Sequence, residues 1–275
     1  MTAPTSIIKI GPSPRLAIAY AGSGDLVLFL HGVGGNRSNW HAQIEALSPF
    51  YLAAAWDMRG YGDSDDYDGP MSIRDVCHDV KRVLDHFAVP KAHIVGLSLG
   101  GMIAQEFYRH FPDCVRSLVL ANTNAGPAAD WTPHQKQEFV DLRRTPLMSG
   151  LSIMDCAPAI VDSLVCDSTA SAVRDDLMES LGKLRQESFL KAVETVVQFN
   201  STEVLATIAV PTLLIGSTDD RVTPIKDIRD MAALIPKARL VEMPGGHLSN
   251  LENPDKFNRA IIDFLATVPQ GREIA

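Results

Sequence analysis

The chain has 275 residues, of which 46% are hydrophobic and 21% are charged, and its formal net charge is −8. This length and hydrophobic content suffice for one large domain with a substantial buried core. The acidic balance argues against a surface that follows nucleic-acid phosphates and against a polybasic membrane anchor.

The N-terminal segment and the cysteines indicate the compartment. MTAPTSIIKIGPSPR has no basic stretch followed by an apolar one, and no apolar run in the sequence is long enough to span a bilayer. The four cysteines form no Cys-x-x-Cys pair, and the eight histidines form no ligand cluster. We therefore expect free thiols, no metal or cofactor, a cytoplasmic location, and no nucleic-acid or membrane partner.

The first half of the chain alternates apolar strands with amphipathic helices. Residues 7–10 and 16–20 predict an antiparallel hairpin, and residues 26–30 form the continuous apolar run of a strand buried on both faces. The remaining elements follow in order: a helix capped by Ser38, a strand at 51–56, a helix at 73–87 capped by Ser72, a strand at 92–97, a helix at 99–110 and a strand at 115–121.

The rhythm is interrupted between residues 124 and 202, which have helical character, contain several prolines and include no buried strand. It resumes with strands at 212–216 and 240–243 and helices at 225–235 and 255–265. Alternating strands and helices predict an α/β fold with a mostly parallel sheet covered on both faces. Both ends of the helical stretch return to this sheet pattern. We therefore favour a cap inserted into a core of residues 1–123 and 203–275 over a separate helical domain.

One short motif suggests a nucleophile. Gly96-Leu97-Ser98-Leu99-Gly100 lies between a predicted strand and a predicted helix. A Gly-x-Ser-x-Gly pattern is weak alone, but in this position it is typical of the tight turn that exposes a nucleophilic serine at the carboxyl edge of a sheet. Glycines are needed there because side chains would collide. Ser98 is the candidate nucleophile, and the N–H of Leu99 is a candidate oxyanion donor.

A nucleophilic serine needs a histidine base and an acid that orients the histidine, in the chain order serine, acid, histidine for this architecture. His247 follows the last predicted strand, in a loop that can reach Ser98. The loop after the preceding strand holds two adjacent acids. Counting from the strand end favours Asp219, whereas counting back from Pro224 favours Asp220. We favour Asp219 because strand geometry limits the reach toward His247.

A glycine-rich loop, His31-Gly32-Val33-Gly34-Gly35, follows the apolar strand at 26–30. Small residues let the backbone approach a substrate oxygen closely, so the N–H of Val33 is the second candidate oxyanion donor. The loop matches neither of the common phosphate-binding glycine patterns. The polar segment from Asp57 to Ser64, which follows the next strand, is better explained as a hydrogen-bonded structural turn.

Other residues have both structural and functional interpretations. Trp40 and Trp131 can line a substrate pocket, although large aromatic residues more often belong to the core. The predicted cap also holds three arginines that can bind a substrate carboxylate, although most such residues are solvated: Arg143, Arg144 and Arg185.

Six segments together resemble the α/β-hydrolases: HGVGG, DMRGYGDS, HIVGLSLGGMIAQ, RSLVLANT, GSTDDRVTP and GGHLSNLENPDKFNRAIIDFL. Within that superfamily, the elbow segment, RSLVLANT and the C-terminal segment are most similar to 3-oxoadipate enol-lactonases. The resemblance covers the chain outside the predicted cap. It implies an α/β-hydrolase fold with a helical cap, triad roles for Ser98, Asp219 and His247, and oxyanion roles for Val33 and Leu99.

These observations predict a serine hydrolase that cleaves a small ester or lactone through an acyl-enzyme, without a cofactor. HGVGG is also similar to the first loop of C–C bond hydrolases of aromatic catabolism, which makes that activity the enzymatic alternative. A ligand receptor with slow turnover on the same fold is the non-enzymatic alternative. The predicted cap matches neither enzyme group, so the substrate stays open.

Overall fold

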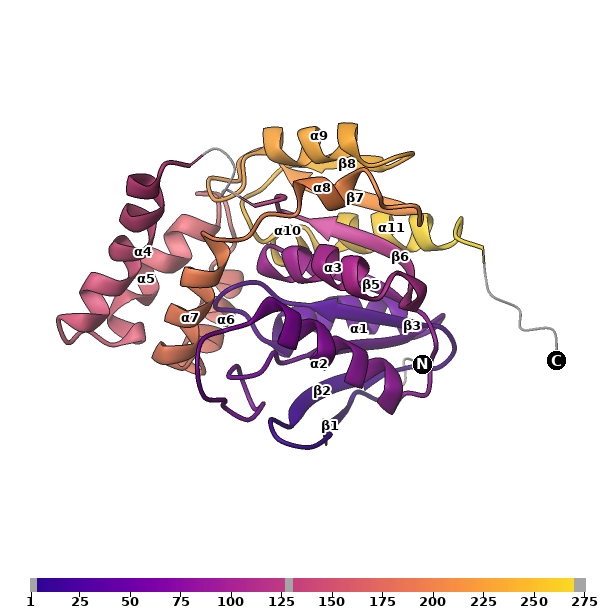
Figure 1. Ribbon diagram of the computed structural model, residues 1–275, viewed down its shortest axis with the longest axis horizontal. Helices are drawn as coiled ribbons and strands as arrows, with labels where there is room; N and C mark the ends of the chain where they lie inside the picture. The colour runs from indigo at the N-terminus through magenta and orange to yellow at the C-terminus, as the bar shows by residue number, and fades with distance from the viewer. Residues whose placement is uncertain (1–3, 127–130, 270–275) are drawn as a thin grey trace.

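A computed structural model describes residues 4–126 and 131–269 (Figure 1). Its single eight-stranded sheet has the order β1-β2-β4-β3-β5-β6-β7-β8. The N-terminal strands β1 (Ser6–Ile10) and β2 (Leu16–Ala21) form the predicted antiparallel hairpin, and β2 also pairs antiparallel with β4 (Leu52–Trp56). All further pairings are parallel and involve β3 (Leu26–Leu30), β5 (Ala92–Leu97), β6 (Val115–Ala121), β7 (Thr212–Ser217) and β8 (Arg239–Met243).

Helices cover both faces of this sheet, as the buried strands require. Along β3, Leu26, Leu28 and Leu30 pack into one apolar cluster, whereas Val27 and Phe29 pack into another. Successive strand side chains point to opposite faces, so a strand buried on both faces is apolar throughout. The first cluster includes residues of α2 (Ile73–His86), α3 (Leu99–His110) and α9 (Ile225–Leu234), and the second includes residues of α1 (His41–Leu47) and α11 (Pro254–Leu265).

The starts of two helices show how local sequence sets the element boundaries. The predicted cap of α2 is confirmed, because the Ser72 side chain accepts a hydrogen bond from the N–H of Asp75 at 3.3 Å. The predicted cap at Ser38 is wrong. A short 3₁₀ helix, η1 (Arg37–Trp40), precedes α1, and Asn36 caps it by accepting from the Ser38 N–H at 2.9 Å.

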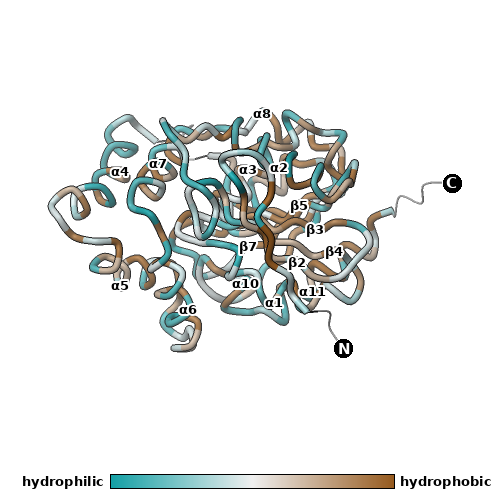
Figure 2. The backbone as a smooth tube through the Cα atoms, turned by 90° about the horizontal axis from the view of Figure 1, so that it is seen from below, coloured by the Kyte–Doolittle hydropathy of each residue, from teal (hydrophilic) through white to brown (hydrophobic). Residues whose placement is uncertain are grey.

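A helical insertion lies between β6 and β7. It contains α4 (Pro133–Met148), α5 (Ile153–Leu164), α6 (Ser171–Gly182), α7 (Gln186–Val196) and α8 (Thr202–Leu205). Figures 1 and 2 show α4–α7 gathered at one end of the molecule. These four helices share an apolar cluster of their own, whereas α8 contributes Val204 and Leu205 to the cluster that includes residues of α2, α3 and α9. Residues 127–130 of the predicted cap lie outside the described residues.

The fold positions one edge of the sheet under the insertion. The backbone N–H of His247, which follows β8, donates to the carbonyl of Leu164 at the end of α5 at 2.7 Å. The carboxyl ends of the parallel strands therefore face the inserted helices, which is where sites form in open α/β sheets. Within the described residues, every helix is too short or too polar to cross a bilayer.

Candidate active site

Ser98 occupies a sharp turn between β5 and α3. Its φ of 56° and ψ of −122° form a backbone conformation that L-residues rarely adopt. Such a conformation costs a non-glycine residue roughly 1–3 kcal/mol. Neighbouring backbone imposes it: the Ser98 N–H donates to the Ala121 carbonyl on β6 at 3.0 Å, and the Ser98 carbonyl accepts from the Gly101 N–H at 2.8 Å. Backbone strain of this kind is concentrated at functional sites, which supports Ser98 as the candidate nucleophile.

The glycines around Ser98 are required by close approach of the backbone. A Cβ atom on Gly100 would lie 2.0 Å from the Leu30 carbonyl oxygen, and one on Gly96 would lie 2.2 Å from the Gly100 carbonyl oxygen. A Cβ on Gly32 would lie 2.9 Å from the Cβ of Ser98. The predicted steric requirement at the elbow is confirmed. The same crowding places the glycine-rich loop after β3 directly against Ser98.

His247 lies in the loop between β8 and α10 (Ser249–Glu252). Its side chain is buried, and its Nδ1 atom is 2.8 Å from Oδ2 of Asp220. This contact identifies Asp220 as the acid that holds the imidazole.

The preference for Asp219 as the partner of His247 is wrong in the structure. Backbone pairing continues beyond the end of β7, because the Thr218 N–H donates to Met243 and the Asp219 N–H donates to Gly245, each at 3.0 Å. Thr218 and Asp219 lie in a turn with both side chains exposed, and the next residue, Asp220, turns its side chain inward. Counting residues from the end of the predicted strand gave the wrong aspartate, because the sequence does not reveal these two additional backbone hydrogen bonds.

The Asp220 carboxylate is held by four donors. Oδ1 accepts from the N–H groups of Val222 and Thr223, each at 2.8 Å, and Oδ2 accepts from Asn122 Nδ2 at 2.9 Å in addition to His247. Burial by itself would raise the pKa of Asp220, but the charge and hydrogen bond of His247, with the other donors, hold that pKa below its ordinary value. Asp220 is therefore ionised at neutral pH.

Asn122 was missed by the sequence analysis. It follows β6 directly, and besides Asp220 its Nδ2 contacts Ser217 Oγ at 3.0 Å while its Oδ1 accepts from Ser249 Oγ at 2.5 Å. The available signal was a polar residue immediately after a buried strand, within the segment RSLVLANT. Asn122 thus positions the acid from a neighbouring strand.

His31 supports the loop that carries Val33. The Met58 N–H donates to Nε2 of His31 at 3.0 Å, which leaves Nδ1 to donate to the Gly32 carbonyl at 2.8 Å. Burial lowers the pKa of His31, which keeps this neutral tautomer in place at neutral pH. The imidazole therefore ties the start of the glycine-rich loop to the turn after β4.

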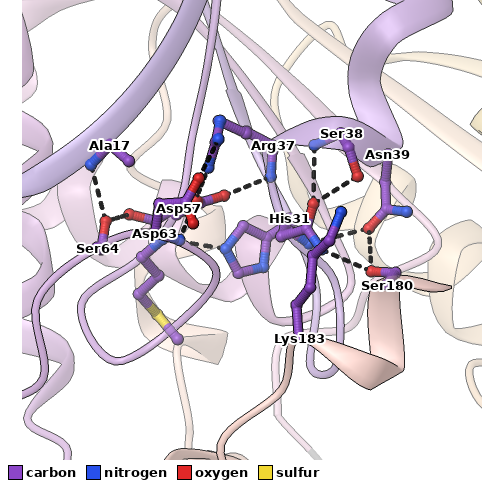
Figure 3. A network of polar contacts seen from close by, with 12 residues as sticks. Ala17, His31, Arg37, Ser38, Asn39, Asp57, Asp63, Ser64, Ser180 and Lys183 are labelled. Carbon is purple, nitrogen blue, oxygen red and sulfur yellow. Dashed lines mark hydrogen bonds and ion pairs between the residues drawn. The ribbon is translucent and has the colours of Figure 1, made fainter. Parts of the chain in front are cut away.

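The turn after β4 contains a buried network of polar contacts (Figure 3). Asp57 is fully buried and pairs with Arg37, whose guanidinium also contacts Asp63. Asp57 accepts the backbone N–H of Arg37 at 2.7 Å, and Ser64 Oγ donates to the Asp57 carbonyl at 2.6 Å. The structural interpretation of residues 57–64 is confirmed, and the network anchors the glycine-rich loop.

The inserted helices contact the glycine-rich loop through Ser180 on α6 (Figure 3). Asn36 Nδ2 donates to Ser180 Oγ at 2.8 Å, and that hydroxyl lies 3.2 Å from Oδ1 of Asn39 and 3.4 Å from the Gly34 carbonyl. Ser180 and Asn36 are both buried. The loop that carries Val33 is thereby connected to the insertion by hydrogen bonds.

Glu252 makes a second connection between the insertion and the site. Its Oε1 accepts from the Gly246 N–H at 3.0 Å, in the loop that holds His247. Its Oε2 accepts from the Cys166 N–H at 3.2 Å and from Thr169 Oγ1 at 2.6 Å, both in the segment between α5 and α6. One carboxylate therefore joins the histidine loop to the inserted helices.

Ser98, His247 and Val33 line one cavity, with a volume of about 580 Å³. Trp40 also lines it, whereas Trp131 is not among the lining residues and packs on Phe139, with ring centroids 5.3 Å apart. Leu99 is the buried first residue of α3. Most other walls of the cavity are apolar side chains of α4–α7, including Phe139, Leu147, Ile160, Leu177, Leu181 and Val193.

A second serine–histidine pair lies away from this cavity. His93 on β5 and Ser117 on β6 face each other, with Nδ1 and Oγ 2.7 Å apart. Both side chains are buried in the sheet, and neither lines the cavity. This pair is a core hydrogen bond. Within the described residues, no group of three or more histidine, cysteine, aspartate or glutamate side chains could hold a metal ion.

Comparison with known proteins agrees with this geometry. Residues 27–260 match the profile of the alpha/beta hydrolase family. The chain belongs to this family. The predicted fold is confirmed, including the mostly parallel sheet and the helical insertion between β6 and β7.

Relatives of this alpha/beta hydrolase carry different activity names. It is 31% identical to the protein named "Putative carbamate hydrolase RutD" of Azorhizobium caulinodans, over 90% of this chain and 94% of that protein. It is 27% identical to 3-oxoadipate enol-lactonase 2 of Acinetobacter baylyi, over 86% of both chains. Among solved structures, a thermophilic esterase from Thermogutta terrifontis has a TM-score of 0.84 and 26% identity, over 97% of this chain and 99% of that one.

Proposed function

We propose that this alpha/beta hydrolase is a serine hydrolase that cleaves a small ester or lactone, with Ser98 as nucleophile, His247 as base and Asp220 as the orienting acid. One observation carries the proposal: the strained Ser98 lines the same cavity as His247, which a buried Asp220 holds at 2.8 Å. A nucleophile, a base and an acid in this chain order are the parts of a catalytic triad.

The chemistry is acyl transfer to water. Nε2 of His247 removes the hydroxyl proton of Ser98 while Oγ attacks the carbonyl carbon, which gives a tetrahedral oxyanion. Collapse of this intermediate expels the alcohol oxygen, which takes the proton from His247. Water then attacks the acyl-enzyme by the same route and releases the acid. The bond from Nδ1 to Asp220 keeps Nε2 free to accept the proton.

The N–H groups of Val33 and Leu99 are the proposed donors to the oxyanion. Two observations support this role. Gly32, next to Val33, lies against Ser98, and Leu99 follows Ser98 at the start of α3. The His31 and Asp57 networks hold the first donor in place. Fixed donors matter because removing one such group typically lowers kcat by about 10²–10³.

The insertion is the proposed cap and selects the substrate. We assign this role to residues 124–202, because α4–α7 supply most of the apolar cavity wall. The cavity volume of about 580 Å³ lies within the range usual for small-molecule sites. The relatives, named as a carbamate hydrolase, an enol-lactonase and an esterase, support attack on a carboxyl-type carbonyl.

A fluorophosphonate probe, which reacts with activated serines, tests the nucleophile. We expect rapid labelling of the wild type and none of Ser98→Ala. Ser117→Ala is the matched control, because its hydroxyl pairs with a histidine away from the cavity. Equal labelling of Ser98→Ala and wild type would refute the proposal, as would a folded wild type that does not label.

A panel of aryl esters, lactones and vinylogous diketones then tests the reaction class. We expect esters and lactones to be cleaved with the higher kcat/KM. Preferential cleavage of the diketones would make the protein a C–C bond hydrolase. Rapid labelling without turnover of any compound would instead support a receptor on this fold.

A further inference from the structure

Among the described residues, Arg143 on α4 is the one arginine or lysine that lines the active-site cavity. Most of the remaining wall is apolar, and the two histidines in it, His31 and His247, already hold hydrogen-bond partners. A guanidinium in such a wall is expensive to desolvate unless an anion accompanies it. Its surroundings therefore decide whether it is structural or binds a ligand.

The protein satisfies only part of this guanidinium. Nη1 donates to the Phe139 carbonyl at 2.9 Å, one turn earlier, and the guanidinium carbon stacks 3.5 Å from the centroid of the Phe139 ring. Burial lowers the pKa of Arg143 to about 10, so the group stays charged at neutral pH. Among the described residues, no carboxylate forms an ion pair with it.

Several other arginines that are partly shielded from solvent form ion pairs with carboxylates. Arg37 pairs with Asp57, and Arg59 and Arg82 both pair with Asp79. Arg144, the neighbour of Arg143, pairs with Glu194. Arg143 differs from these arginines because no carboxylate pairs with it among the described residues; Arg185 also lacks one, but it does not line the cavity.

In the described part of the chain, Asp155 is the single acid in the cavity wall, and its carboxylate already has hydrogen-bond partners. Asp155 lies in the first turn of α5, and its Oδ2 accepts from the N–H and the hydroxyl of Ser152, each at 2.7 Å. It is exposed and makes a helix-capping arrangement that explains its presence. Asp155 is therefore not the counter-ion of Arg143.

We propose that Arg143 binds a carboxylate of the substrate, so that the enzyme acts on esters or lactones that carry a second, ionised carboxyl group. This inference rests on the proposed function, because it places that carboxylate in the cavity that Ser98 lines. Among the described residues no acceptor binds Nε or Nη2 of Arg143, so its planar guanidinium can form a bidentate pair with a carboxylate. Stacking on Phe139 holds the guanidinium plane in advance of binding.

Long-range charge does not oppose this binding. The net charge of −8 would repel an anion at a distance, but physiological salt screens charges beyond about 8 Å. Inside the cavity, the local cation dominates. The Arg143 guanidinium therefore favours anionic over neutral substrates only at short range, inside the cavity.

The test compares mono-4-nitrophenyl adipate with its neutral methyl ester as a matched substrate pair. Wild type should favour the anionic ester in kcat/KM. Arg143→Met should lower the ratio of anionic to neutral kcat/KM by about tenfold to a hundredfold, mainly through KM, because it removes a charge-assisted hydrogen-bonded pair. Arg143→Lys, which keeps the charge without the fork, should fall between them. Arg144→Met is the matched control and should leave the ratio unchanged.

A binding measurement separates this inference from the proposed reaction. Calorimetric binding of adipate to Ser98→Ala should be lost when Arg143→Met is added, even if no ester is hydrolysed. Unhydrolysed esters would contradict the proposed function, and equal adipate binding to both variants, or none to either, would overturn the carboxylate site. An unchanged ratio of anionic to neutral kcat/KM in Arg143→Met would overturn it as well.

Discussion

The Asp219-Asp220 pair shows how one residue of register separates a solvent-exposed carboxylate from one that holds the site. Asp220 Oδ2 contacts His247 Nδ1, whereas Asp219 Oδ2 accepts a hydrogen bond from the Thr218 hydroxyl at 3.0 Å. The two side chains have the same chemistry and opposite burial. Their environments alone therefore assign different roles to them.

Isosteric replacement of each acid tests this assignment. Asp220→Asn should lower kcat by about a thousandfold or more, because the amide no longer fixes the imidazole tautomer or stabilises its charged form. Asp219→Asn should change kcat by less than about twofold. Steady-state ester hydrolysis and fluorophosphonate labelling rates measure both effects. A larger loss in Asp219→Asn than in Asp220→Asn would contradict the geometry.

At this scale, residue type and order carried much of the prediction. Ser98 and His247 followed from a tight-turn motif and a loop after a strand, and both line the cavity. Their catalytic roles stay predictions. The choice of Asp219 as the acid was wrong, because the direction of the two side chains depends on backbone bonds to Met243 and Gly245, which are distant in sequence. Asn122 and Glu252 escaped notice for the same reason.

Two connections between elements link the insertion to the site. Ser180 on α6 contacts the loop that carries Val33, and Glu252 on α10 joins the histidine loop to the segment after α5. Both connections use hydrogen bonds from backbone groups or buried side chains, which are costly to leave unpaired. The packing of the inserted helices and the positions of the reacting groups are therefore coupled.

Glu252→Gln tests this coupling with little change in shape. The amide presents a donor where the carboxylate accepts from Cys166 and Thr169 or from Gly246, so at least one donor loses its partner. We expect the free energy of unfolding in urea to fall by about 1–3 kcal/mol. We also expect kcat to fall, because His247 is held less firmly.

The control for this prediction is Glu242→Gln. Glu242 pairs with Arg229 at the surface, where an ion pair contributes only about 0–1 kcal/mol. It lies on β8, outside the histidine loop. Equal losses of stability and activity in the two variants would show that Glu252 has no special connecting role.

Element boundaries were predictable where a pattern was local. The predicted strands at 92–97 and 115–121 and the helix at 99–110 coincide with β5, β6 and α3. The cap of α1 was misplaced, because Asn36 begins a 3₁₀ turn that periodicity does not reveal. The individual helices of the insertion were not resolved, because their prolines at 146 and 158 lie inside α4 and α5 and do not end them.

The topology of the whole molecule followed from the alternation of strands and helices. Strands joined by crossover connections run parallel, and parallel strands have their carboxyl ends at one edge of the sheet. The cavity could not be predicted in the same way, because its wall is formed by α4–α7 packing over that edge. Arg143 illustrates this limit: the sequence shows an arginine, and only the packing shows that no carboxylate of the described residues pairs with it.

The buried histidines make the stability of the whole molecule depend on pH. Burial, with a smaller contribution from Arg116, lowers the pKa of His93 to about 4, and burial also lowers the pKa of His31. In an unfolded chain both groups titrate near about 6.5. Below that pH the unfolded chain binds protons that the folded chain does not. The stabilisation is therefore complete above about pH 6.5 and is lost as the pH falls toward each folded-state pKa.

Urea unfolding between pH 7.5 and pH 4.5 measures this dependence. Each of the two histidines should lower the free energy of unfolding by up to about 1.4 kcal/mol per pH unit. His93→Gln alters the contact with Ser117, so its free energy of unfolding should be lower than that of the wild type at pH 7.5. Because glutamine cannot take up a proton, the free energy of unfolding of this variant should fall less steeply toward pH 4.5. His134→Gln should parallel the wild type, because that side chain is solvent-exposed. Identical slopes for wild type and His93→Gln would show that His93 is not held neutral by burial.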